Sequence, residues 1–272
     1  MRRLEISASI FGALGFGLRH VVAFFVLGLL PGLPKYLHSF LPREDLGAQL
    51  QEVWPQGQAF PEGMRSFLLP RPEWETEFAV PLAETFLFGI ALAVVVQTLA
   101  GDRRGATWSV FSALGAVLRH LPTVLGVSLV CALALATANY LSAVIPYAAL
   151  PLGLFALFLS VVFCVVIPCA AVENHGMADC IEYSAELSNG SRWRIVAVFV
   201  LSFLPIFGVG FATALVLQYA FDVRSLDIAP HWRLVGGALF AVYFLPLMAV
   251  IHEALVALKE GPDPGAAAAV FD

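Results

Sequence analysis

Metal-capable side chains gather in one short stretch of this 272-residue chain, at Cys169, Glu173, His175 and Cys180. Thiol, imidazole and carboxylate groups are the ligands that zinc prefers, and zinc-binding cysteines are usually separated by roughly two to four residues. The spacings in this stretch match no zinc pattern, and the start of a helix at the membrane surface explains the stretch equally well. The sequence therefore predicts no metal site and no cofactor.

Three ionisable side chains lie within long apolar segments and are candidate intramembrane polar groups: Glu84, His252 and Glu253. Such a group costs about 2.5–3.5 kcal/mol at the centre of a membrane span. Glu84 lies near the end of its segment, within reach of Lys35, and Glu253 is placed to pair with Arg194. None lies at a midpoint, where a proton-coupled transporter needs its relay.

No catalytic motif accompanies these groups. His252-Glu253 lacks the second histidine of a zinc-protease helix, and the chain contains no phosphate-binding glycine loop or dinucleotide fingerprint. We therefore expect the protein not to be an enzyme.

An internal repeat indicates how these residues are positioned. The segment SIFGALGFGLRH at 9–20 recurs one hundred positions later as SVFSALGAVLRH at 109–120, with eight of the twelve positions identical. Each copy ends in Arg-His and leads into a long apolar stretch, and a fainter third copy lies at 183–196. Because a repeat reveals the construction unit of a fold, we expect three units, each with a short lead-in helix, a basic hinge and a helical hairpin.

The composition is that of an integral membrane protein. The chain is 60% hydrophobic and only 13% charged, whereas soluble proteins carry about 25% charged residues. The net charge of −5 argues against a nucleic-acid partner, which requires a basic surface. A spanning helix needs about 20 apolar residues, and six segments qualify: 19–39, 79–100, 121–143, 147–171, 194–219 and 233–257.

Basic residues predict the orientation of these spans. Nine fall on one side: Arg2, Arg3, Arg19, Arg103, Arg104, Arg119, Arg192, Arg194 and Lys259. Six fall on the other: Lys35, Arg43, Arg65, Arg71, Arg224 and Arg233. Because basic residues favour the cytoplasmic side, the first side is predicted to be cytoplasmic, with both termini inside.

The predicted fold class is all-α, a polytopic membrane protein with six transmembrane helices. One domain covers 1–258, with repeats at about 5–100, 105–171 and 176–258 and an outer loop at 36–78. Residues 259–272 are predicted to form a disordered cytoplasmic tail, from their glycine, alanine and proline content.

The three lead-ins are predicted to lie in the membrane interface. In the third, 176–189, Met177, Ile181, Ser184 and Leu187 share one helical face, and glycine after Asn189 gives a helix stop. Basic side chains at the hinges would meet anionic lipid headgroups. The candidate anchoring residues are Arg19, His20, Arg119, His120, Arg192 and Trp193.

The third repeat carries a resemblance. Its residues Pro168, Glu173, Ser184, Leu187, Gly190, Arg192 and Trp193 resemble the pattern P-(x)-E … S-x-x-L-x-x-G-x-R-W. This pattern is similar to that of a bacterial six-span family typified by the membrane domain of glycerophosphodiester phosphodiesterases. The resemblance implies the six-span fold, a bacterial inner-membrane location and a structural role for Pro168, Glu173, Ser184, Leu187 and Gly190.

The same resemblance does not carry over the phosphodiesterase activity. In the fused enzymes a separate soluble barrel is catalytic, and here the six spans occupy the chain. Relatives are also basic near the position of Glu182, where this chain is acidic. The expected function is a non-catalytic module that organises membrane lipid, a protein partner or a homo-oligomer. The alternative is a small transporter or lipid-translocating protein with prolines that interrupt its helices, at Pro151, Pro168, Pro205 and Pro246.

Overall fold

A computed structural model describes residues 6–40, 75–103, 110–145, 149–173, 175–220 and 225–259, and all regular structure in these ranges is helical. The helices are α1 (Ile6–Arg19), α2 (Val21–His38), the π-helix η1 (Glu75–Ala79), α5 (Val80–Arg103), α6 (Val110–Arg119), α7 (Leu121–Val144), α8 (Ala149–Val172), α9 (Met177–Ser188), α10 (Arg192–Ala220) and α11 (Ser225–Lys259). The all-α prediction is confirmed.

Five helices in this part of the chain are long and apolar enough to cross a membrane, which suggests a membrane protein. They cover Val21–His38, Thr76–Arg103, Leu121–Val144, Leu150–Val172 and Leu234–Lys259. The remaining predicted span, 194–219, falls on α10, which is helical over Arg192–Ala220 but is not among these five. Most of the predicted outer loop and all but the first residue of the predicted tail lie outside the described residues.

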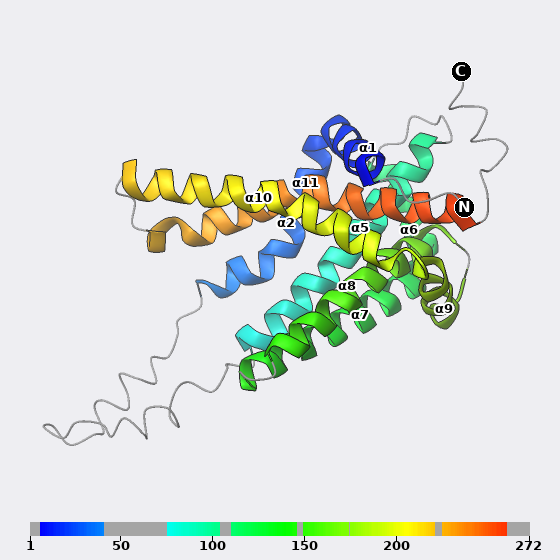
Figure 1. Ribbon diagram of the computed structural model, residues 1–272, viewed down its shortest axis with the longest axis horizontal. Coiled ribbons are helices and arrows are strands. Elements are labelled where there is room, and N and C mark those ends of the chain that lie inside the picture. Colours follow the sequence, from blue (N-terminus) through cyan, green and yellow to red (C-terminus); the bar gives the residue numbers. More distant parts are fainter. Residues whose placement is uncertain are drawn as a thin grey trace, which may run out of the picture.

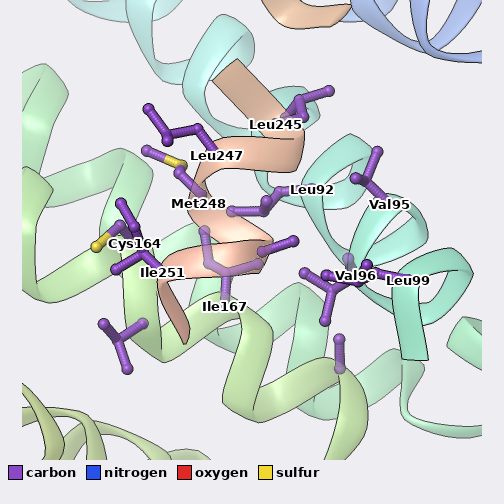
Figure 2. Packing of buried hydrophobic residues seen from close by; sticks show 14 of the residues in the cluster. Leu92, Val95, Val96, Leu99, Cys164, Ile167, Leu245, Leu247, Met248 and Ile251 are labelled. Carbon is purple, nitrogen blue, oxygen red and sulfur yellow. The ribbon is translucent and has the colours of Figure 1, made fainter. Parts of the chain in front are cut away.

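The spanning helices form one packed bundle. In Figure 1, α5, α7 and α8 run side by side, and α10 and α11 lie along another part of the bundle. Helix α11 contacts α2, α5 and α8, so it lies at the centre of the packing. Figure 2 shows the apolar side chains where three helices meet: Leu92, Val95, Val96 and Leu99 of α5, Cys164 and Ile167 of α8, and Leu245, Leu247, Met248 and Ile251 of α11.

Small residues allow the closest helix approaches. A Cβ atom added to Gly28 of α2 would lie 2.6 Å from the Ala241 Cβ and 2.9 Å from the Ala238 backbone oxygen on α11. Between α5 and α7, a Cβ on Gly89 would overlap the Ser128 side chain. Helices inside membranes associate through such small residues because lipid provides no hydrophobic driving force.

The three lead-in helices are α1, α6 and α9. Helix α1 packs on α11, α6 packs mainly on α5, and α9 packs mainly on α8. The first two end at Arg19 and Arg119. The next residues, His20 and His120, precede α2 and α7 with similar backbone angles, φ −113° and ψ 23° against φ −103° and ψ 13°. The third ends before Gly190, whose φ of +79° is a conformation that glycine adopts without steric cost.

Candidate functional site

A polar cluster lies where α8 ends and α9 and α11 approach it. Glu173 is the residue after α8, and its backbone N–H still donates to the Cys169 carbonyl at 2.9 Å. This helical hydrogen bond places Cys169 and Glu173 one turn apart on the same face. His175 follows in the connection to α9, Cys180 lies on α9, and His252 comes from α11.

The Glu173 carboxylate is the centre of this Cys169–Glu173–His175–His252 cluster. Its Oε2 atom lies 3.3 Å from Nδ1 of His175 and 3.4 Å from Sγ of Cys169. Its Oε1 atom lies 3.6 Å from Nε2 of His252. This last distance suits an ion pair but is too long for a hydrogen bond, and Nε2 of His252 has no hydrogen-bond partner.

The cluster is buried on its α8 and α11 sides and open on its α9 side. Cys169 is fully buried, and the side chain of His252 is only 7% exposed. The Glu173 side chain is 20% exposed and that of His175 is 47% exposed. His175 is therefore the most exposed member of the cluster.

The electrostatic surroundings favour a charged Glu173 and a neutral Cys180. Burial acts to raise the pKa of Glu173, but contacts with His252, Cys169 and His175 outweigh it and lower that pKa below its ordinary value. For Cys180, burial raises the pKa of the thiol, and the carboxylates of Glu173 and Asp179 act in the same direction against the opposing Cys169 contact.

Neighbouring groups hold the cluster in position. The His175 ring stacks on Tyr183 of α9, with centroids 5.7 Å apart and planes 14° from parallel. At the start of α9, the Gly176 backbone N–H donates to Oδ2 of Asp179 at 3.2 Å, which satisfies one of the free N–H groups of a helix N-terminus. These contacts restrict the connection that carries His175.

The same end of the bundle is tied together by further polar contacts. Arg103 of α5 binds Glu253 of α11 with two nitrogens, Nε to Oε1 at 3.1 Å and Nη2 to Oε2 at 3.2 Å. Glu253 therefore pairs with Arg103, and the predicted pairing with Arg194 is wrong, because α11 packs closely against α5. Gln97 donates to the Ala171 carbonyl, an interhelical bond between α5 and α8.

The motif residues Ser184, Leu187 and Arg192 contact or pack near α8 farther from its end at Val172. Oγ of Ser184 donates to the Val162 carbonyl of α8 at 2.9 Å, and Leu187 is 1% exposed. Nη2 of Arg192 donates to the Ala185 carbonyl at 3.4 Å, and its guanidinium lies 5.4 Å from the centroid of the Phe158 ring.

The structure divides the residues that were predicted to share one membrane-facing side of α9. Ser184 and Leu187 are buried together with Cys180 and Ser188, whereas Met177 and Ile181 are exposed to 42% and 38%. Both sets fit the helical period, and contact with α8 selects the face that contains Cys180. Trp193, one of the predicted anchors, is 85% exposed.

The other candidate residues lie away from the cluster. Glu84 lies within electrostatic range of Lys35, and among the described residues the two side chains form no direct ion pair. Pro168 lies inside α8, which stays helical through it. Arg19 is 75% exposed at its side chain and lies 3.9 Å from Asp102 of α5, while His20 and His120 occupy the two hinges and Arg119 ends α6.

Chemically, the cluster offers a mixed sulfur, nitrogen and oxygen ligand set. One ligand atom from each of Cys169, Glu173 and His175 can be chosen so that all three lie within 4.8 Å of one another. The spacing of Cys169 and Glu173 by four residues is the signal that could have brought them together from sequence. His252 lies far along the chain, and no local pattern connects it to them.

Comparison with known proteins gave no match: no family model, no curated protein and no solved structure matches this chain. The functional argument therefore rests on the residues themselves.

Proposed function

We propose that this protein is a non-catalytic, multi-pass protein of the bacterial inner membrane that binds and organises anionic lipid at its lead-in helices. The proposal includes six spans in three repeats, with both termini inside, and membership of the six-span family that the third repeat resembles. The observation that carries it is an exposed apolar stripe that recurs on two lead-in helices, each ending in arginine.

The recurring stripe has the same exposure in both copies. On α1, Phe11, Leu14 and Leu18 are exposed to 71%, 44% and 62%. Their counterparts on α6, Phe111, Leu114 and Leu118, are exposed to 86%, 43% and 58%. Between them, Ala13 and Ala113 are both fully buried. One face of each helix therefore packs on the bundle while the opposite face presents large apolar side chains outward.

Such a face suits the boundary between headgroups and acyl chains. Helices in the membrane interface dip apolar side chains below the headgroups and keep basic groups among them. An arginine near anionic lipid contributes about 1 kcal/mol. Arg19 and Arg119 end the two helices, so each stripe has a basic group beside it.

The third lead-in, α9, is a weaker lipid site. It exposes Met177 and Ile181 but also carries Asp179, Glu182 and Glu186, which repel anionic headgroups. Because Arg192 already contacts the Ala185 carbonyl and Phe158, we assign it a structural role. The test below therefore leaves Arg192 unchanged.

The test is native mass spectrometry of the full chain extracted directly into lipid-preserving discs. The wild type is expected to retain anionic lipid, and the Arg19→Gln/Arg119→Gln variant to lose it. The control Lys35→Gln/Arg43→Gln removes the same number of positive charges on the opposite predicted side of the membrane and should keep the lipid. Arg43 lies outside the described residues. An unchanged lipid complement in Arg19→Gln/Arg119→Gln would refute lipid binding here, and a retained protein partner without selected lipid would indicate an assembly module.

The transporter alternative receives less support. It expects a polar cavity at mid-membrane, whereas the described core between α5, α8 and α11 is packed with apolar side chains (Figure 2). A groove of about 370 Å³ between α7 and α8 is lined almost wholly by apolar residues, including Leu133, Leu141 and Phe155. Helices α8, α10 and α11 also remain helical through Pro168, Pro205 and Pro246.

A further inference from the structure

We infer that Cys169, Glu173, His175 and His252 form a zinc site that ties the end of α8 to α11. This inference is independent of the proposed lipid function. The sequence predicted no metal here because its spacings match no zinc pattern, but those patterns describe ligands close together in the chain. Here one ligand comes from a distant helix.

The distances between the side chains suit a tetrahedral ion. Zinc binds nitrogen, oxygen and sulfur at about 2.0–2.3 Å, so the ligand atoms of a tetrahedral site stand about 3.3–3.8 Å apart. Oε2 of Glu173 lies 3.3 Å from Nδ1 of His175 and 3.4 Å from Sγ of Cys169, and Oε1 lies 3.6 Å from Nε2 of His252. Cys169, Glu173 and His175 can each place one ligand atom within 4.8 Å of the others, and His252 approaches from the other side of the carboxylate.

His252 is the independent observation that points to a ligand. Its side chain is 7% exposed and is directed at the Glu173 carboxylate, yet Nε2 has no hydrogen-bond partner. A buried polar atom without a hydrogen-bond partner is unfavourable, and a metal ion between Nε2 and the carboxylate would satisfy it. Completing the site requires His252 to move toward Cys169 and His175.

The chemistry of the ligands selects the ion. Thiolate and imidazole disfavour the hard ions calcium and magnesium, which take oxygen ligands, and suit zinc. The stacking of His175 on Tyr183 fixes the direction of the imidazole, a supporting contact of the kind that metal sites need. The thiol of Cys180 also lies close to Cys169, and we assign it a supporting role, so the site contains one sulfur ligand.

The test uses the full chain in lipid discs under reducing conditions, loaded with zinc, freed of unbound ion by gel filtration and analysed for metal. The wild type should retain about one zinc per chain, and Cys169→Ala, His175→Ala and His252→Ala should lose it. Two control variants replace a cysteine and a histidine that lie outside the cluster, and both should retain zinc. Cys164→Ala removes another fully buried α8 thiol, which contacts the Val161 carbonyl, and His120→Ala removes the α7 hinge imidazole.

Two further measurements keep the inference falsifiable if a core variant fails to fold. His175 lies half-exposed in a connection, so His175→Ala should fold, and zinc should raise the thermal midpoint of the wild type but not of this variant. Cobalt substituted for zinc should give the absorption of a tetrahedral site with one thiolate. Equal zinc in wild type and His175→Ala, an octahedral cobalt spectrum, or a Cys169–Cys180 disulfide in the reduced sample would each overturn the site.

Discussion

The two units α1–α2 and α6–α7, each a lead-in helix followed by a span, share their lead-in sequence and its burial pattern but contact different partners. In both, the residue before the spanning helix is a histidine whose carbonyl accepts from an amide four residues on, Phe24 at 2.9 Å and Val124 at 3.0 Å. Yet α1–α2 packs on α11, whereas α6–α7 packs on α5.

The positions of glycine residues explain why the two units pack on different helices. Gly17 of α1, which would clash with the Val242 carbonyl if it had a Cβ, corresponds to Val117 in α6. Gly28 of α2 corresponds to Ser128 of α7, and there the glycine is Gly89 on the partner helix. The repeated sequence therefore gives the two lead-in helices similar hinges, and a few small residues adapt each copy to the helix that it contacts.

The largest expected effect comes from filling the α2–α11 contact. Gly28→Leu should lower the free energy of unfolding by about 3 kcal/mol, because Ala238 and Ala241 leave no room for a side chain. The measurement is unfolding in mixed micelles with dodecyl sulfate. Gly153→Ala, at an open position of α8, is the control, and wild-type stability in Gly28→Leu would show that α2 does not approach α11 this closely.

A smaller loss of stability is expected from a glycine substitution in α1 that has no counterpart in α6. Gly17→Ala should cost about 1–2 kcal/mol by displacing α1 from Val242. The equivalent pair Gly15→Ala and Gly115→Ala, where nothing lies within 4 Å of the added Cβ, should instead stabilise the helices by about 0.5–1 kcal/mol. The same unfolding measurement checks all three variants, and a destabilising Gly15→Ala would contradict the assigned faces.

The third lead-in helix, α9, differs from the first two because a hydrogen bond from Ser184 connects it to α8. Ser184→Ala should cost about 1 kcal/mol, since it removes the hydrogen bond that the buried Ser184 side chain donates to the Val162 carbonyl of α8. Ser160→Ala is matched, because Oγ of Ser160 bonds to the Ala156 carbonyl within its own helix at 2.9 Å, and should change stability little. Equal effects of the two substitutions would remove the case for specific docking.

The smallest effect is expected for the ion pair between Arg103 and Glu253, which links α5 and α11. A double-mutant cycle of Arg103→Gln and Glu253→Gln should give a coupling of about 0.5 kcal/mol that weakens with salt, because both side chains are partly exposed. The parallel cycle of Arg194→Gln with Glu253→Gln should give a coupling near zero. A larger coupling energy between Arg194 and Glu253 than between Arg103 and Glu253 would instead support the predicted ion pair of Glu253 with Arg194.

Much of the helix order was predictable, because its signals are local. Apolar segments of spanning length, the Arg-His hinges and the glycine at 190 each depend on neighbouring residues, and the described helices follow them closely. The ion-pair partner of Glu253 and the side of α9 that contacts α8 were not predictable. In both cases several residues were equally suitable by sequence position, and only the packing of the helices decides among them.

By itself, the sequence determined an all-helical, apolar chain with repeated lead-in helices, since composition and periodicity act through each segment alone. Only the tertiary structure decided that α1 docks on α11 while α6 docks on α5, and that His252 meets Glu173. Those contacts join residues far apart in the chain, so their geometry depends on how whole helices pack rather than on any local pattern.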